Sequence, residues 1–129
     1  MPVYSFNHIH LLTRDPKATA RYYNKMFGAK IVESTQSDGK QRIDLELDGV
    51  SIFILRVPPE QETPASPPGP YLGLDHFGLR VNNLDEAAAE LKAKGAEFAV
   101  EPKTIRPGVR IAYVRGPENA RIELVEHKP

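Results

Sequence analysis

Three histidines and one glutamate in this sequence have the residue types and the spacing needed for metal chemistry. His8 and His10 stand two positions apart in the segment NHIHLL, and residues two apart on a β-strand point to the same side. His76 and Glu123 lie in two further segments, DHFGL and RIELVE. Two imidazoles and one carboxylate form the facial set that binds divalent metals and leaves coordination positions open. The alternative is that these are ordinary polar residues on strands, with their hydrogen bonds satisfied nearby.

An internal repeat distinguishes between the two neighbouring histidines. Sliding the sequence so that His8 falls on His76 also brings Arg42-Ile43 onto Arg110-Ile111. Self-similarity of this kind indicates a duplicated structural unit. His8 thus has a counterpart in His76, whereas His10 falls on a glycine. We therefore expect His8 and His76 to be ligands, and His10 to lie beside them.

Each copy of the repeat is predicted to fold in the order βαβββ. Asp15 is a favourable N-cap, Pro16 suits the first helical position and Gly28 suits the residue after the helix. In the second copy Asn83 is the expected N-cap and Gly95 ends the helix. The expected strands cover residues 4–12, 29–34, 41–47 and 50–56, then 74–81, 97–101, 110–114 and 121–126.

A proline-rich segment separates the two copies. The sequence holds twelve prolines, and the stretch PPEQETPASPPGP has no hydrophobic periodicity, which is typical of an extended, solvated linker. We expect a first module over residues 1–57, a linker over 58–73 and a second module over 74–129, within one structural domain. The predicted fold is of the α+β class, with two βαβββ modules forming a curled mixed sheet around a metal-binding cleft.

Alternation along the strands assigns the candidate ligands to one face of the sheet. Ile9 and Ile122 fit the apolar face that the helices should cover. His8, His76 and Glu123 then point to the uncovered face. If the sheets of the two modules curl toward each other, these three side chains converge.

Composition excludes several other classes of function. Seventeen basic residues balance seventeen acidic ones, which argues against a surface for nucleic acid or anionic membrane. The absence of cysteine excludes disulfides, zinc–thiolate sites and thiol nucleophiles. No apolar run approaches the about 20 residues of a membrane span. We expect a cytoplasmic protein that acts on a small molecule.

Most of the chain resembles the vicinal oxygen chelate superfamily, which includes glyoxalase I, methylmalonyl-CoA epimerase, extradiol dioxygenases and fosfomycin-resistance proteins. The matching stretches are NHIHLLTRDPKATARYYNKMFGAKIVE, LDHFGLRVNNLDEAAAELKAKGAEF and GVRIAYVRGPENARIELVE. The resemblance implies paired βαβββ units around one divalent metal ion (Fe²⁺, Mn²⁺, Zn²⁺, Co²⁺ or Ni²⁺), and relatives of this size commonly form homodimers. The ligand positions of the superfamily map onto His8, His76 and Glu123.

The resemblance has one departure, at Phe53. Glyoxalase I and methylmalonyl-CoA epimerase carry a fourth ligand, Glu or Gln, at this position, and phenylalanine does not bind a hard metal. A site with three protein ligands is more similar to those of extradiol dioxygenases and fosfomycin-resistance proteins. Phe53 is instead expected to contact the substrate.

Three residues are candidates for catalysis. The second half, through EPKTIRPGVRIAYV and RIELVE, looks most like methylmalonyl-CoA epimerase, and that resemblance makes Asp44 a candidate general base. Tyr113 lies at the spacing from Glu123 that extradiol dioxygenases and fosfomycin-resistance proteins share, and it could donate to an oxyanion. His10 is a second candidate base. The repeat pairs Tyr113 with Leu45, so strand parity predicts that Asp44 and Tyr113 do not face the same side unless a bulge intervenes.

Several functions fit these residues. The first is proton transfer by a metal-dependent isomerase, epimerase or lyase acting on a small oxygenated substrate. The second is an extradiol dioxygenase, although the linker lacks the histidine that such enzymes use. A fosfomycin-type thiol transferase and a drug-binding resistance protein are further alternatives. The candidate clamps for a substrate carboxylate or phosphate are Arg80, Arg110 and Arg121.

Overall fold

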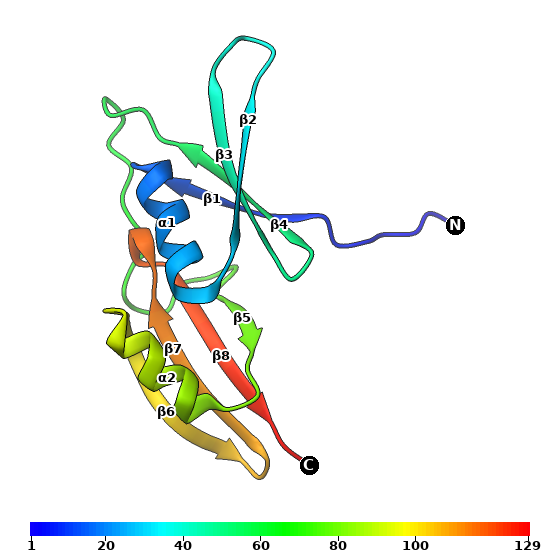
Figure 1. Cartoon of the computed structure of the whole chain (residues 1–129), viewed down its shortest axis with the longest axis vertical. Coiled ribbons are helices and arrows are strands. Elements are labelled where there is room, and N and C mark those ends of the chain that lie inside the picture. The colour runs from blue at the N-terminus through cyan, green and yellow to red at the C-terminus, as the bar shows by residue number, and fades with distance from the viewer. The chain divides into compact units, whose positions relative to one another are not determined.

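The computed structural model describes the whole chain, residues 1–129. The chain divides into two compact units, Met1–Thr63 and Pro64–Pro129, which we call unit 1 and unit 2. Each unit contains one α-helix and one four-stranded sheet in the element order βαβββ (Figure 1). The predicted α+β fold with two βαβββ modules is therefore confirmed.

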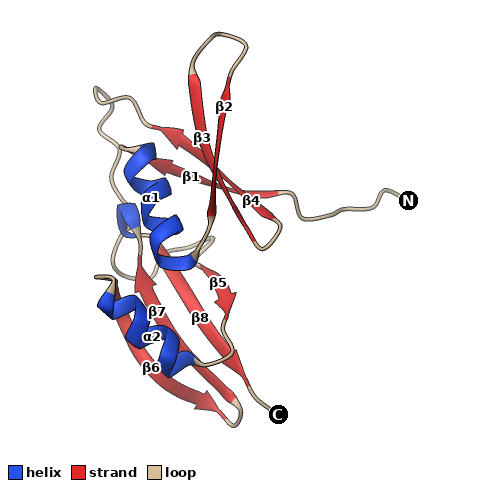
Figure 2. Ribbon diagram, in the orientation of Figure 1, coloured by secondary structure: helices blue, strands red, loops and turns tan.

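Unit 1 has a mixed sheet with the strand order β1-β4-β3-β2. β1 runs parallel to β4, and the other neighbours are antiparallel. The helix α1 packs against β2, β3 and β4 (Figure 2). The elements are β1 (His8–Thr13), α1 (Pro16–Phe27), β2 (Lys30–Thr35), β3 (Gln41–Leu47) and β4 (Val50–Arg56).

Unit 2 repeats this topology with the strand order β5-β8-β7-β6. β5 is parallel to β8, and α2 packs against β6, β7 and β8. A short 3₁₀ turn, η1, precedes the last strand. The elements are β5 (Phe77–Arg80), α2 (Leu84–Ala93), β6 (Glu97–Arg106), β7 (Val109–Arg115), η1 (Pro117–Asn119) and β8 (Arg121–His127).

The predicted helix caps are present in both units. The Asp15 carboxylate accepts a hydrogen bond from the Ala18 backbone N–H at 3.1 Å, and Gly28 follows α1 in the left-handed region at φ 72°. The Asn83 side chain accepts from the Glu86 N–H at 3.1 Å. These bonds satisfy backbone donors that the first turn of a helix leaves unpaired, so both helices start where the sequence indicates.

The core of each unit lies between its helix and one face of its sheet. In unit 1, Tyr23 of α1 is buried with Leu45 and Ile52 of the sheet. In unit 2, Leu84 of α2 is buried with Ile122. The apolar residues that alternate along the strands thus face the helix, as predicted, and the polar residues between them lie on the opposite, uncovered face.

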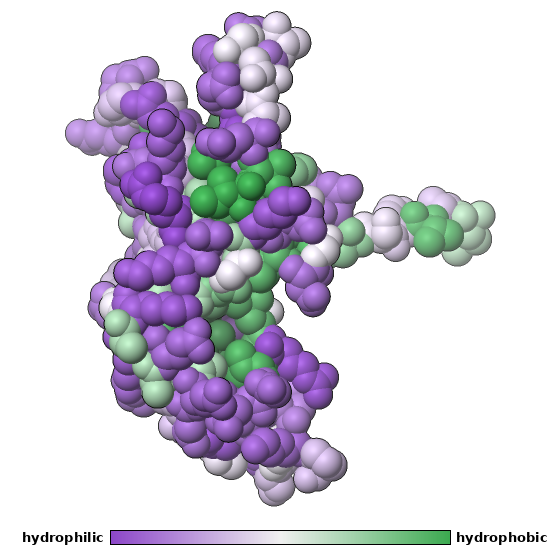
Figure 3. All heavy atoms as spheres, viewed as in Figure 1, coloured by the Kyte–Doolittle hydropathy of each residue, from purple (hydrophilic) through white to green (hydrophobic).

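The first strand begins at His8, not at residue 4 as predicted. β1 pairs only with β4, and the first pair joins His8 to Ser51. Residues 1–7, which we call the N-terminal arm, have no strand to pair with. Their alternation of apolar and polar residues therefore predicted a longer strand than the structure contains. Neither helix has the length and apolar composition needed to cross a bilayer. Figure 3 shows the N-terminal arm as an extended segment. Its apolar side chains Val3, Tyr4 and Phe6 are exposed.

The strand predicted over residues 74–81 is also shorter, because β5 spans only Phe77–Arg80. Its partner β8 begins at Arg121, directly after η1, and the first pair joins Phe77 to Ile122. His76 therefore precedes the regular strand. The alternation of side chains between the two faces of a paired strand therefore does not determine the direction of the His76 side chain.

The turn between β6 and β7 permits a test of backbone strain. Gly108 has φ +77°, and a Cβ there would lie 2.3 Å from the Lys128 carbonyl oxygen. We expect Gly108→Ala to lose about 1–2 kcal/mol through the left-handed backbone and about 1–3 kcal/mol more through the clash. Gly39→Ala is the matched control, since Gly39 has φ +84° with nothing within 4 Å of its Cβ position. Equal losses in urea unfolding of the two variants would contradict this account.

Candidate functional site

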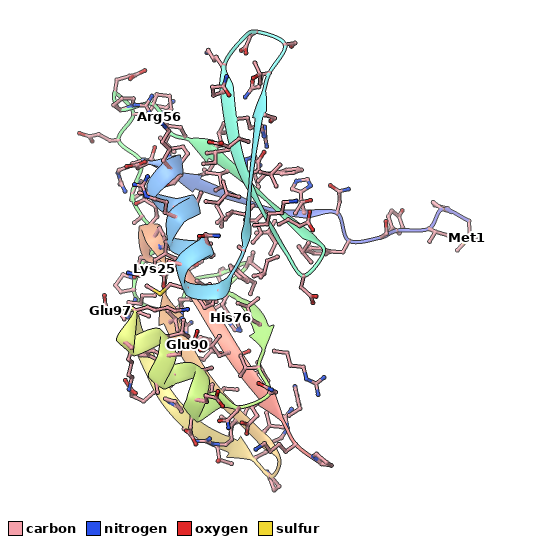
Figure 4. The ribbon with its side chains drawn as sticks, viewed as in Figure 1. Met1, Lys25, Arg56, His76, Glu90 and Glu97 are labelled. Atoms are coloured by element: carbon pink, nitrogen blue, oxygen red, sulfur yellow. The ribbon has the colours of Figure 1, made fainter.

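The uncovered face of unit 2 brings together three of the predicted site residues. Tyr113 of β7 lies opposite Glu123 of β8, and Gly78 of β5 lies on the other side of Glu123. His76, labelled in Figure 4, places its Nε2 3.5 Å from Glu123 Oε1. The His76 and Tyr113 rings meet edge to face, with centroids 5.0 Å apart. The register of β7 and β8 thus aligns Tyr113 with Glu123, and His76 reaches them from the position just before β5.

Gly78 leaves the space beside the Glu123 carboxylate open. A Cβ at this position would lie 3.5 Å from Glu123 Oε1, so even the smallest side chain would touch the carboxylate oxygen. This separation is an ordinary van der Waals contact, so Gly78 places the β5 backbone directly beside the Glu123 carboxylate.

The His76 ring is also bonded on its other side. Its Nδ1 lies 2.7 Å from Asp75 Oδ2, and the same oxygen accepts from Arg121 Nη1 at 2.6 Å. These hydrogen bonds and the charge of Arg121 hold the pKa of the Asp75 carboxyl below its usual range. Arg121 in turn lies over the Tyr113 ring, with its guanidinium carbon 4.5 Å from the ring centroid. Arg121, predicted as a substrate clamp, is thus engaged within the protein.

Tyr113 has a perturbed phenol. Partial burial raises its pKa, and a hydrogen bond to the neighbouring Glu123 carboxylate raises it further. The phenol therefore keeps its proton and acts as a hydrogen-bond donor on this face. A protonated tyrosine is the form that stabilises a developing oxyanion.

The uncovered face of unit 1 carries the other predicted histidines. His8 stacks on Phe53 with centroids 4.3 Å apart, and His10 meets Phe53 edge-on at 6.2 Å. The His8 Nδ1 is 2.7 Å from the Asn7 side-chain oxygen. Because Ile52 and Ile122 are the corresponding buried residues of β4 and β8, Phe53 occupies in unit 1 the position that Glu123 occupies in unit 2.

Asp44 uses both carboxylate oxygens within unit 1. Its Oδ1 accepts from the Ile54 backbone N–H at 2.9 Å, and its Oδ2 accepts from Arg42 Nε at 2.5 Å. Arg42 lies over the Phe53 ring, 5.0 Å from its centroid. This carboxylate therefore binds the β4 backbone and orients Arg42, and both bonds compete with abstraction of a proton.

The expectation that Asp44 and Tyr113 face different sides of their modules is wrong. Leu45, next to Asp44, pairs with Ile52, and Val114, next to Tyr113, pairs with Ile122. Asp44 and Tyr113 are therefore equivalent, and each lies on the uncovered face of its own unit. The repeat offset changes between the first and third strands, so one fixed shift gave the wrong parity.

The two remaining arginine candidates lie in different environments. Arg80 is exposed on β5, in phase with Gly78, and so lies on the uncovered face of unit 2. Arg110 lies on the face that α2 covers, where its two terminal nitrogens bond to Asp85 at 2.9 and 3.1 Å. Arg110, predicted as a substrate clamp, is thus turned toward α2 and bonded there to Asp85.

The donors of unit 2 fit a divalent metal ion. His76 Nε2 and Glu123 Oε1 are 3.5 Å apart, less than the about 4.2 Å spanned by two metal–ligand bonds of about 2.1 Å. One ion can therefore contact both atoms. Within either unit, no group of three or more His, Cys, Asp or Glu side chains is gathered as a metal site. The third predicted ligand, His8, belongs to unit 1.

Comparison with known proteins identifies the family. The sequence profile of the glyoxalase/bleomycin resistance protein/dioxygenase superfamily matches residues 5–124. The chain belongs to this superfamily. The uncharacterized protein YwkD of Bacillus subtilis is 30% identical to this chain over 129 residues. The match covers 95% of this chain and 96% of YwkD. A probable chloroplastic lactoylglutathione lyase of Arabidopsis thaliana is 33% identical over 58 residues, 44% of this chain and 17% of that protein.

Solved structures of the glyoxalase superfamily share the fold. A glyoxylase/bleomycin resistance protein/dioxygenase domain from Frankia sp. EAN1pec superposes with a TM-score of 0.77 at 22% identity, covering 98% of this chain and 100% of that one. The fosfomycin resistance protein FosX of Listeria monocytogenes superposes with a TM-score of 0.73 at 19% identity, covering 98% and 94%. The predicted superfamily is thus confirmed, while the predicted closeness to methylmalonyl-CoA epimerase stays a prediction.

Proposed function

We propose that this member of the glyoxalase superfamily is a divalent-metal-dependent isomerase, epimerase or lyase that transfers a proton on a small oxygenated substrate. His76, Glu123 and His8 would hold the metal, and the protein would act as a homodimer. The proposal is supported chiefly by one observation: an imidazole nitrogen and a carboxylate oxygen lie 3.5 Å apart beside a tyrosine phenol on one sheet face.

The donor set determines what a bound ion would contribute. One nitrogen and one carboxylate oxygen from unit 2, with a further imidazole from His8, suit iron, manganese, cobalt, nickel or zinc. A divalent ion held there would supply Lewis-acid stabilisation of negative charge on a substrate oxygen. Phe53 stands where glyoxalase I carries a fourth ligand, so three protein side chains would leave positions open.

The residues of this chain then divide the remaining work. Tyr113 keeps its proton, and its hydroxyl, which donates to Glu123 in the free protein, would redirect that hydrogen bond to a substrate oxygen that gains negative charge. Arg80 would attract an anionic substrate. The proton acceptor is His10, whose ring nitrogens make no hydrogen bond within the structure. Asp44 is a weaker candidate because both of its oxygens accept bonds from Ile54 and Arg42.

Deuterium wash-in tests proton transfer directly. The metal-loaded protein is incubated in heavy water with a panel of α-substituted carbonyl compounds, and exchange at the α-carbon is followed by NMR. We expect exchange for at least one compound, with a strong loss in His10→Ala and little change in Asp44→Asn. Absence of exchange throughout the panel, in protein with stoichiometric metal, would contradict the proposed reaction.

The second candidate is an extradiol dioxygenase. The observation that favours it is the pairing of Tyr113 with Glu123 beside His76, which is the tyrosine spacing expected for such enzymes. Loading with Fe²⁺ under anaerobic conditions, followed by addition of catechols and oxygen, distinguishes the two reactions. Oxygen uptake with ring cleavage would replace the first proposal. A fosfomycin-type transferase has less support, because the similarity to FosX at 19% identity concerns the fold alone.

A further inference from the structure

Both candidate metal-binding histidines are preceded by a residue that binds the same ring nitrogen. Asp75 Oδ2 lies 2.7 Å from His76 Nδ1, and Asn7 Oδ1 lies 2.7 Å from His8 Nδ1. The two pairs are equivalent in the repeat and occur in separate units. A chance side-chain contact would have no reason to recur at the same ring nitrogen and the same distance in both copies.

We propose that Asp75 and Asn7 are positioning residues that fix the tautomer of His76 and His8, so that Nδ1 carries the proton and Nε2 presents its lone pair. This inference rests on the proposed function, because a lone pair on Nε2 is what a metal ion requires. A carboxylate accepts hydrogen bonds and donates none, and the Asn7 amide turns its acceptor oxygen toward His8 Nδ1. A neutral ring bonded to such an oxygen donates from Nδ1, and it then has no hydrogen on Nε2.

The two carboxylates around His76 compete for the ring proton. Asp75 is 2.7 Å from Nδ1, whereas Glu123 is 3.5 Å from Nε2. The shorter contact is a charge-assisted hydrogen bond, so it retains the proton. Without Asp75, the ring would donate from Nε2 to Glu123, and one hydrogen would occupy the space between the two candidate ligands.

Arg121 reinforces the arrangement in unit 2. Its Nη1 donates to the same Asp75 oxygen at 2.6 Å, and its guanidinium lies against the Tyr113 ring. Asp75 is thereby held in its ionised form and in a fixed rotamer. Asn7 is neutral and exposed and has no such support. We therefore expect His76 to be the more firmly oriented of the two histidines.

The test measures the tautomers without metal. Nitrogen-15 NMR of the histidine rings in the full, metal-free chain, recorded at alkaline pH, reports which nitrogen carries the hydrogen. We expect Nδ1–H for both His76 and His8 in the wild type. Asp75→Ala should convert His76 to Nε2–H and leave His8 unchanged, while Asn7→Ala should do the reverse.

Metal titration gives the second readout. Asp75→Ala should weaken Co²⁺ or Zn²⁺ binding by about 10–100-fold, the usual effect of removing a residue that orients a ligand. Asp75→Asn keeps an acceptor but loses the charge, and should fall between wild type and Asp75→Ala. Asp85→Ala is the matched control: Asp85 is also an exposed aspartate bonded to an arginine in unit 2, but it contacts no histidine. It should change neither tautomer nor affinity.

The outcomes separate this inference from the proposed function. An Nε2–H tautomer of His76 in the wild type, or an unchanged tautomer in Asp75→Ala, would overturn the positioning role. The expected tautomers with no metal binding in the wild type would leave the proton placement standing, and would overturn the metal-dependent function instead.

Discussion

Replacing Glu123 with alanine is expected to abolish stoichiometric metal binding and all metal-dependent activity. Glu123 is the only anionic member of the proposed ligand set, so its loss removes both a ligand and the charge that offsets the cation. The loss in affinity should exceed the about 10–100-fold cost of changing a residue that merely orients a ligand. Metal analysis of purified protein, followed by competition titration, measures the effect.

Two further variants make this result interpretable. Glu97→Ala removes an exposed glutamate of the same unit at the start of β6 (Figure 4), and should bind metal as the wild type does. Glu123→Gln keeps the shape and one oxygen, and should bind more weakly than the wild type but better than Glu123→Ala. Full metal occupancy in Glu123→Ala, with folding intact by circular dichroism, would remove the centre of the proposed site.

Removing the Tyr113 hydroxyl is expected to slow the reaction with little effect on metal binding. Loss of one preorganised donor to an oxyanion typically lowers kcat by about 10²–10³-fold. Tyr113→Phe retains the ring that contacts His76 and Arg121, so the local packing should persist. The expected signature is a fall in kcat with a nearly unchanged KM and unchanged metal content.

Tyr71→Phe is the control for this substitution. Tyr71 is an exposed tyrosine outside the strands and helices of unit 2, so loss of its hydroxyl should leave kcat at the wild-type value. If Tyr113→Phe retained full activity, Tyr113 would be a packing residue on β7. A fall in metal content together with kcat would assign Tyr113 to support of Glu123 rather than to contact with substrate.

Strand alternation was sufficient to predict the faces of most site residues. Tyr113 and Glu123 lie on a shared face because β7 and β8 pair residue by residue, and Gly78 of β5 pairs with Glu123 on the other side. The caps at Asp15 and Asn83 were equally readable, because short polar side chains at helix starts have a specific bonding role. Local rules of this kind need no knowledge of the whole chain.

The remaining site features depend on details that alternation does not contain. Asp75 and Asn7 lie just before regular strands, so parity gave no indication that either would reach its neighbour's ring; their shared place before each histidine was the available signal. The relation between Asp44 and Tyr113 depended on loop lengths within each copy. Arg110 was predicted as a substrate clamp because it lies near a turn. Arg110 and Tyr113 are an odd number of residues apart on β7, so strand alternation already indicated that Arg110 faces α2 when Tyr113 faces the other side.

The contrast between Phe53 and Glu123 has a consequence for how such proteins diverge. The two positions are related by the duplication, on strands with the same neighbours, yet one holds an aromatic ring and the other a carboxylate. If the proposed metal site is correct, the side chain at this one position therefore decides how many protein ligands the two copies supply, with no change of backbone. Duplication thus provides two equivalent strand positions. A substitution at one of them can alter the coordination of the proposed metal while the carboxylate at the other is kept.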